Sequence, residues 1–332
     1  MSKIELTICT YNRSEILQAN LQHNIQSIID YGMMLSVYDS STNDDTKKVV
    51  DSFNSEYGGF IHYRKFNSSY RVDDKVLTAI LDCRCEYSWP IADTTFITKN
   101  SFKYKISPYI EQNYDFICLY NCRTIYDGKI YTNSYDFVYD CFWHATWLGG
   151  IVFKKVLFNS LYSKQIYDDF LRKYNKNDGF SYLGIFYDLI TRKNIKAVFS
   201  TIDFLNIGIK KKQNWLKRYL EVWCYNLCYF VDSLDNYYDR LKDKVLRETW
   251  KVLSLDKFYW NYRARLAGGL NEDIFNYYNN NGYLDRVTYN KTIISYCALM
   301  PIFILKLTYI LIRIIELPKK IIDKLIRICI KR

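Results

Sequence analysis

The sequence predicts an α/β protein whose sheet begins parallel and becomes mixed, followed by a helical C-terminal region. Three observations predict this fold. Strand-like and helix-like segments alternate over residues 4–91, short polar clusters follow three of the strands, and the pattern after residue 213 is helical and rich in aromatic side chains. With 332 residues, 49% of them hydrophobic and 24% charged, the chain is long enough for two globular domains, and its composition excludes a disordered or polytopic membrane protein.

The first part of the chain favours a parallel sheet. Short apolar segments predict strands at 4–9, 34–38, 60–64 and 87–91. Apolar residues at helical spacing predict helices at 16–29, 45–53 and 73–82. Asn12 is expected to cap the first helix, with Glu15 three residues later. Because short loops join alternating strands and helices, we expect helices on both faces of the sheet.

The pattern changes after residue 120. Asp127-Gly128 predicts a hairpin between strands 124–126 and 129–131. Further strands are expected at 137–142, 147–153 and 197–199, and helices at 161–174 and 181–193. The predicted domains are 1–209, an aromatic-rich helical region at 210–298, and a basic tail at 299–332.

The charge of the chain limits its possible binding partners, and its cysteine content indicates the cellular compartment. The formal net charge is +11, from 46 basic and 35 acidic residues. Residues 299–332 carry eight basic and two acidic residues, so more than half of the excess lies in this tail. A nucleic-acid-binding protein would show a wider basic surface, so we expect no nucleic-acid partner. The N-terminus has no apolar signal segment, and the ten cysteines are expected to be buried thiols in the cytosol.

Polar clusters follow the first, second and fourth predicted strands. They are residues 10–13 (Thr-Tyr-Asn-Arg), 39–41 (Asp-Ser-Ser) and 93–95 (Asp-Thr-Thr). Ligands of open α/β sheets bind outside the carboxyl ends of the strands. The three clusters are therefore expected to converge on one binding rim.

The order of these motifs resembles the family 2 glycosyltransferases, which have the GT-A fold. The resemblance rests on residues 7–13, on the acidic residue and Ser-Thr turn at 37–42, and on the strand that ends at Asp93. It covers about residues 3–205. Residues 213–332 match no motif of the family.

The resemblance implies an enzyme that moves a sugar from a UDP-sugar to a hydroxyl. Thr10, Asn12 and Arg13 would line the uridine pocket, and Asp39 would accept a hydrogen bond from uracil. Asp93 would contact the ribose or ligate Mn²⁺ or Mg²⁺.

The metal site departs from the family pattern. The family motif has two or three carboxylates, and this chain has one. Either the diphosphate holds the metal, or cationic side chains replace it. Arg71 and Lys75 are the candidates to reach the phosphates; alternatively both are solvated helix residues.

The sequence identifies the residues of the acceptor site less clearly. By resemblance, Asp178 would be the general base, with Asp168 and Asp169 as competitors. Alternatively Asp178 is a helix cap. His144 and Trp147 are candidates for the wall of the acceptor site, because aromatic faces suit sugar rings; a structural histidine is the alternative.

The tail favours a membrane surface. No apolar run in it reaches the roughly 18–20 residues that span a bilayer. On a helical wheel its charged residues form one narrow stripe opposite Ile and Leu, and Pro318 divides the pattern. Such a helix is typical of interfacial membrane binding, although packing on the protein or on a second subunit is the alternative.

These features together predict an inverting hexosyltransferase on the cytoplasmic face of the cell membrane. Its acceptor would be a lipid-linked glycan in bacterial capsule or other surface polysaccharide synthesis. Two alternatives remain: a catalytically weak helper of a partner enzyme, and a soluble transferase that glycosylates a protein.

Overall fold

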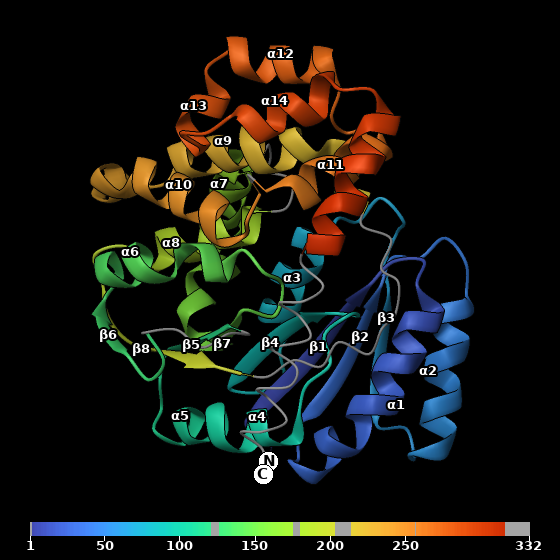
Figure 1. Cartoon of the computed structure of the whole chain (residues 1–332). Coiled ribbons are helices and arrows are strands. Elements are labelled where there is room, and N and C mark those ends of the chain that lie inside the picture. The colour runs from blue at the N-terminus through green and yellow to red at the C-terminus, as the bar shows by residue number, and fades with distance from the viewer. Residues whose placement is uncertain (1, 121–125, 175–179, 203–213, 256, 316–332) are drawn as a thin grey trace, which may run out of the picture. The chain divides into compact units, whose positions relative to one another are not determined.

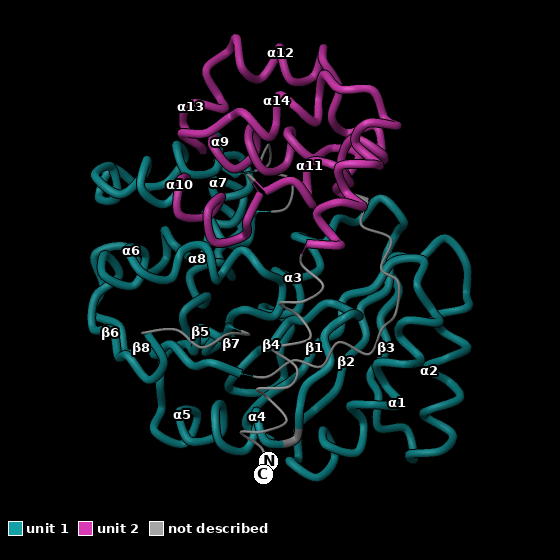
Figure 2. Tube along the Cα trace, viewed as in Figure 1, with its two compact units in different colours: residues 1–212, 229–245 teal, residues 213–228, 246–332 magenta. Residues whose placement is uncertain are grey.

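The computed structural model describes residues 2–120, 126–174, 180–202, 214–255 and 257–315. The chain forms two compact units (Figure 2). The first comprises residues 1–212 and 229–245, and the second comprises residues 213–228 and 246–332. The chain crosses between them within α9 (Leu227–Ser233) and α10 (Lys242–Val252). The three-domain division expected from the sequence stays a prediction.

A mixed sheet of eight described strands forms the centre of the first unit (Figure 1). The strand order is β3-β2-β1-β4-β7-β5-β8-β6. The strands are β1 (Ile4–Thr10), β2 (Met34–Asp39), β3 (Ile61–Lys65), β4 (Tyr87–Ala92), β5 (Phe116–Tyr120), β6 (Ile130–Asn133), β7 (Ile151–Lys154) and β8 (Asn194–Thr201). Strands β1 to β4 run parallel, and β7 and β6 are antiparallel to their neighbours. The prediction of a parallel sheet that becomes mixed is confirmed.

The direction of strand addition reverses between β1 and β4. From β1 the chain proceeds outward to β2 and β3, and then returns to place β4 on the other side of β1. The register puts Thr10 beside Asp39 and Cys9 beside Ala92, so Asp93 follows β4 level with the end of β1. Such a reversal is the usual place for a ligand in an open α/β sheet.

Helices cover both faces of this sheet. The helices of the first unit include α1 (Ser14–Asp30), α2 (Asp45–Glu56), α3 (Val72–Leu81), α4 (Lys99–Lys105), α5 (Ser107–Glu111), α6 (Ser134–Ala145), α7 (Lys164–Tyr174) and α8 (Ser181–Ile190), with the 3₁₀ helices η1 (Lys155–Tyr162) and η4 (Asn236–Leu241). On one face α1, α2, α4 and α5 bury a continuous apolar cluster that includes Leu6, Ile8 and Trp89. On the other face α3 packs on β1 and β4, and α6 packs on β5 and β8.

Two predictions about the middle of the chain were wrong or incomplete. The segment 137–142, expected as a strand, lies inside α6, where Phe137, Val138, Cys141 and Ala145 are buried at helical spacing and Asn133 caps the helix. Its aromatic residues have a preference for strands, but burial of one side of the helix outweighs this preference. The strand β5 was not predicted. Of the expected hairpin, residues 124 and 125 lie outside the described residues, and β6 pairs with β8.

The second unit is helical in its described residues, as predicted. It contains η2 (Asn214–Arg218), the π-helical turn η3 (Glu221–Asn226), α11 (Phe258–Ala267), α12 (Glu272–Asn280), α13 (Tyr283–Val287), α14 (Thr292–Leu299) and a final helix at 302–315. The ring of Trp215 lies 6.0 Å from Trp223 and 5.3 Å from Trp260, and the Trp250 indole donates to the Trp223 carbonyl. These tryptophans therefore contact one another, and Trp250 among them is buried in the core of this unit.

Two properties concern the whole described chain. Within the described residues, no helix is long and apolar enough to cross a membrane. The eight cysteines among these residues are buried thiols, as expected.

Candidate functional site

The carboxyl ends of β1, β2 and β4 bring three of the predicted site residues together. The Thr10 hydroxyl donates a 2.9 Å hydrogen bond to Oδ2 of Asp93, 83 positions later in the sequence. Thr10 is also the register partner of Asp39 on its other side. The predicted convergence of the polar clusters is therefore present at the point where the sheet reverses.

Asp93 is a buried carboxylate with partners on both oxygens. Oδ2 accepts from Thr10, and Nη1 of Arg13 lies 3.3 Å from Oδ1. The side chain of Asp93 is 3% exposed, whereas that of Arg13 is 31% exposed. Burial raises the pKa of Asp93 above its ordinary value, while the charge of Arg13 and the bond from Thr10 act to lower this pKa. Arg13 therefore supplies positive charge at the solvent side of a buried anion.

The turn after Asp93 is held by two buried asparagines of α1. Nδ2 of Asn20 donates to the carbonyls of Asp93 at 2.9 Å and Thr95 at 2.8 Å. Asn24 bonds the Thr95 carbonyl at 3.1 Å and accepts from the Ile97 amide at 3.0 Å. A helix on one face of the sheet thus fixes the backbone that carries the carboxylate.

Lys75 is buried beneath the same rim. Its ammonium group donates to the Thr10 carbonyl at 2.7 Å and to the Ser40 hydroxyl at 3.0 Å. Burial lowers its pKa, and the neighbouring charges of Asp39 and Asp93 raise it. The alternative that Lys75 is a solvated helix residue was wrong, because the side chain points inward from α3 and ties β1 to the turn after β2. The suggested phosphate contact of Lys75 stays a prediction.

Asp39 is also buried, at the end of β2. Oδ1 accepts from the Ser41 amide at 2.7 Å, and Oδ2 accepts from the Tyr63 hydroxyl at 2.8 Å and from Nζ of Lys65 at 3.1 Å. A carboxylate has about four acceptor positions, so three donors leave room for roughly one more. The side chain of Lys65 is 35% exposed, which makes it the partner best able to leave.

Asn12 does not cap the first helix. Arg13 occupies the cap position without a side-chain cap bond. Asn12 itself has a left-handed backbone, with φ of 51°, and its Oδ1 accepts from the Thr42 amide at 2.9 Å. Its amide donates to the Ser41 hydroxyl at 2.7 Å. The cap prediction was wrong because Asn12 instead joins the loops after β1 and β2, a role that fits its tolerance of left-handed backbone.

Arg71 lies at the start of α3. Its Nε is 3.2 Å from Oδ2 of Asp74 on the same helix, and its side chain is 35% exposed. The proposed phosphate contact of Arg71 stays a prediction.

The predicted acceptor-side residues lie at the end of α6 and in the turn that follows. His144 is fully buried, with its ring 4.3 Å from that of Tyr120 and 4.4 Å from that of Phe199. Burial lowers the pKa of His144 to about 2, so its imidazole is neutral. In the turn, a Cβ on Gly150 would lie 2.7 Å from the His144 carbonyl oxygen, so this tight approach requires glycine.

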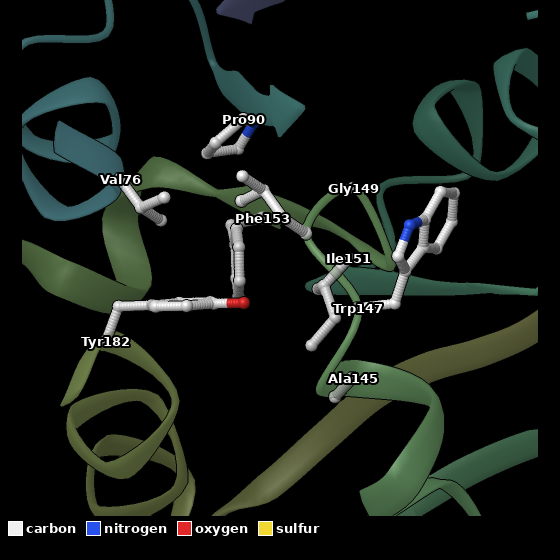
Figure 3. A pocket seen from close by; sticks show the side chains of 9 residues that line it. Val76, Pro90, Ala145, Trp147, Gly149, Ile151, Phe153 and Tyr182 are labelled. Atoms are coloured by element: carbon white, nitrogen blue, oxygen red, sulfur yellow. The ribbon is translucent and has the colours of Figure 1, made fainter. Parts of the chain in front are cut away.

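Trp147 lines a small cavity with Tyr182 of α8, Pro90 of β4 and Val76 of α3 (Figure 3). In Figure 3 the ring of Tyr182 extends into the middle of this group. The cavity has a volume of about 10 Å³, which is the space of roughly one water molecule. A sugar needs far more room, so the acceptor roles of Trp147 and His144 stay predictions that this conformation does not support.

The predicted base, Asp178, lies outside the described residues. Helix α8 begins three residues later at Ser181, whose amide is 3.4 Å from Oδ2 of Asp73 on α3. Of the competitors on α7, Asp169 pairs with Arg172 at the surface, and Asp168 is partly buried. The described start of α8 is thus attached to the helix that also carries Lys75.

Solved structures share this arrangement of strands and helices. The mannosyltransferase PcManGT from Pyrobaculum calidifontis, in complex with GDP-Man and Mn²⁺, matches with a TM-score of 0.51 and 13% identity, over 80% of this chain and 73% of that chain. This chain has the GT-A fold.

Two further matches have TM-scores below 0.5, and no argument depends on them. Residues 1–349 of S. aureus TarS match over 89% of this chain and 90% of that chain, with 11% identity and a TM-score of 0.47. Mannosyl-3-phosphoglycerate synthase from Rubrobacter xylanophilus matches over 73% and 75%, with 12% identity and a TM-score of 0.43. No family model and no curated protein matches the sequence.

A protein of the GT-A fold, PcManGT, is in complex with Mn²⁺, so we asked whether this chain could hold a divalent cation. The described residues do not form a suitable site. Hard cations favour several anionic oxygen ligands. Asp93 provides one carboxylate, and Thr10 and Arg13 already engage both of its oxygens. The described part of the chain contains no group of three His, Cys, Asp or Glu side chains able to hold a metal. Positive charge at this end of the GT-A sheet comes instead from Arg13, and from Lys75 beneath it.

Sequence reasoning missed several residues of this GT-A rim. Tyr63 and Lys65 come from β3 and bond Asp39, and no local pattern indicates that contact. Asn20 and Asn24 did carry a signal, because they are amides within the otherwise apolar stripe of α1 that includes Leu17, Leu21 and Ile25. Polar residues on a buried helix face need partners, and here the partners are the turn after Asp93.

Proposed function

We propose that this chain is a glycosyltransferase that takes its sugar from a UDP-sugar. The observation that carries the proposal is the bond between Thr10 and Asp93 at the reversal point of a GT-A sheet, with Asp39 adjacent in register. Burial of a carboxylate costs free energy, and recognition of a polar ligand is one function that explains why a protein keeps such a group at the sheet edge.

The proposed donor contacts follow from chemistry. Asp39 accepts the ring N–H of uracil at the acceptor position that its three present donors leave, or at Oδ2 after Lys65 withdraws. Arg13, which is paired with Asp93 but partly exposed, faces the negative charge of the diphosphate. Thr10 and Asn12 keep the loops in place, Thr10 by holding Asp93 and Asn12 by holding the loop after β2.

The proposed reaction is a single displacement with inversion. Asp178 removes the proton from the acceptor hydroxyl as the oxygen attacks the anomeric carbon. The bond between that carbon and the β-phosphate oxygen breaks, and UDP leaves with the electron pair. The position of Asp178 in the sequence, three residues before α8, supports this assignment, because α8 is attached to α3 beside the rim.

The proposed acceptor is a hydroxyl of a lipid-linked glycan, in the synthesis of a bacterial surface polysaccharide such as a capsule, on the cytoplasmic face of the cell membrane. Support for it comes from the basic and apolar C-terminal sequence. A water-soluble acceptor would give no reason for such a sequence.

A second function is a helper protein that binds a nucleotide without turnover. The observation that favours it is that both oxygens of Asp93 are engaged within the protein. Measurement of UDP release from a UDP-sugar, with and without membrane extract as a source of acceptor, distinguishes the two. Sustained release supports the enzyme, and binding without release supports the helper.

The test of donor binding is calorimetric titration of UDP into the full chain, with Asp39→Asn as the variant. The substitution preserves the shape of the side chain and removes its charge. We expect UDP affinity to fall by about tenfold or more, the value of one hydrogen bond to a charged group. Unchanged affinity would remove Asp39 from the donor site.

A further inference from the structure

The final described helix, residues 302–315, has an exposed apolar face. Six of its apolar residues point outward and are each more than half exposed: Phe303 (65%), Leu307 (58%), Ile310 (52%), Leu311 (60%), Ile314 (60%) and Ile315 (69%). At about 100° per residue they lie within an arc roughly 140° wide. Exposed apolar patches of this kind mark interaction surfaces.

The opposite side of the same helix is packed within the second unit. Leu305 is fully buried, and the ring of Tyr309 stacks 4.9 Å from that of Tyr262. The Thr308 hydroxyl lies 2.9 Å from the Tyr296 hydroxyl. The helix is therefore anchored along one side, and no other part of the described chain covers the apolar arc.

Positive charges adjoin one edge of this arc. On the helical wheel Lys306 and Arg313 lie next to Ile310, and residues 302–315 contain no acidic residue. Arg313 extends along the helix over the ring of Tyr309, 5.7 Å from its centroid. A wide apolar face with cations at its edge is the pattern of a helix that lies in a membrane interface.

Charge also distinguishes the partners that could cover the apolar arc: a second copy of the chain, the rest of this chain, or a membrane. A second copy of this helix would bring Lys306 and Arg313 against equal charges. The chain beyond residue 315 has six basic and two acidic residues, so it offers no complementary charge either. An anionic bilayer supplies both the apolar phase and the negative headgroups.

We infer that the second unit binds the surface of an anionic membrane through the apolar arc of helix 302–315, with Lys306 and Arg313 on the lipid headgroups. This goes beyond donor binding at the sheet edge and does not depend on it. The arc enters the interface in the plane of the membrane, and the packed side of the helix stays on the protein.

The test is co-sedimentation of the full chain with vesicles of phosphatidylcholine alone or mixed with phosphatidylglycerol. We expect sedimentation with the anionic vesicles, much less with the neutral ones, and weaker binding at high salt. Leu307→Glu/Leu311→Glu places two charges in the arc and is expected to reduce binding by about tenfold or more.

The matched control is Leu266→Glu/Tyr277→Glu, which also introduces two glutamates at exposed positions, here in α11 and α12 of the same unit. It is expected to bind like the unchanged chain. Because all four side chains are exposed, thermal melts of both variants are expected to match the parent.

Three results would overturn the inference. One is a parent chain that stays in the supernatant with anionic vesicles. Another is a Leu307→Glu/Leu311→Glu variant that sediments as well as the parent. The third is a dimer in solution that the same substitutions dissociate, because the arc would then bind a second copy.

Discussion

The hydroxyl of Thr10 lies 2.9 Å from Oδ2 of Asp93 and joins the carboxyl ends of β1 and β4. These strands flank the point where the strand order reverses, so the bond closes the sheet edge where a ligand of this fold is expected. Asp39, Lys75, Asn20 and Arg13 all contact one of these two residues or its neighbours. The stability of this network and its ligand binding can be tested separately.

Thr10→Val removes the hydroxyl at nearly constant volume and leaves Asp93 with one donor fewer. We expect the free energy of unfolding at pH 7 to fall by about 1–3 kcal/mol, measured in urea. The folded-state pKa of Asp93 is raised, so its contribution to stability falls as pH rises from 3.8 through that pKa. The loss in Thr10→Val should therefore be smaller at pH 4 than at pH 7. The exposed Thr42→Val is the control, and equal stability of Thr10→Val and its parent at pH 7 would exclude this bond as a stabilising one.

Lys75→Met removes the buried cation near Asp39 and Asp93. The variant leaves the Thr10 carbonyl without its lysine donor and removes one of the positive charges near the two buried carboxylates, which keep Arg13 and Lys65 as partners. We expect a loss of about 3 kcal/mol in unfolding free energy at pH 7. Lys48→Met, at a lysine whose side chain is 76% exposed, serves as the control and should change stability little. A stable Lys75→Met protein would show that the carboxylates do not need this charge.

The burial of His144 predicts that the protein loses stability in acid. Burial lowers its folded-state pKa to about 2, against 6.5 ordinarily, so the unfolded chain binds a proton between these values and the folded chain does not. Stability is therefore lost as pH falls below 6.5. Between pH 7 and pH 5 this residue should account for about 2 kcal/mol of the loss.

The check is to compare the unfolding free energies of the parent and His144→Phe at both pH values. Phenylalanine keeps an aromatic ring beside Tyr120 and Phe199 but cannot bind a proton. The decrease in unfolding free energy between pH 7 and pH 5 should therefore be about 2 kcal/mol smaller in the variant than in the parent. His62→Phe, at an exposed position, is the control. The same acid loss in parent and His144→Phe would contradict the burial argument.

Asp178→Asn tests the proposed base without changing the size of the side chain. We expect UDP affinity to stay as in the parent and the transfer rate to fall by about 10²–10⁴-fold, the usual contribution of a general base. Asp169→Asn, at the competitor paired with Arg172, should transfer at the parental rate. If instead Asp169→Asn loses transfer and Asp178→Asn keeps it, the base assignment moves to α7.

The strand ends were predictable because their signals are local. An apolar run followed by Asp39 or Asp93 indicates both the strand and the side on which its polar turn lies, and the structure places both residues there. The helix α6 was mistaken for a strand because its aromatic residues have strand preference, while its burial depends on packing against β5 that the sequence does not display.

The contacts of the rim were not predictable in the same way. Lys75 is 65 positions from Thr10, and Lys65 is 26 positions from Asp39. Such pairs are set by how α3 and β3 pack, and a lysine at the start of a helix gives no local sign that it is buried. The asparagines of α1 are intermediate, because their place in an apolar stripe indicates a buried partner without identifying it.

The most direct test of the account is calorimetric titration of UDP into the parent chain, first with EDTA and then with Mn²⁺. Because Arg13 and Lys75 supply the positive charge and Asp93 is already engaged, the account predicts saturable binding in EDTA, of similar affinity in Mn²⁺. Binding that appears with Mn²⁺ and not with EDTA would contradict the metal-free donor site. No binding in either condition would contradict the donor site itself.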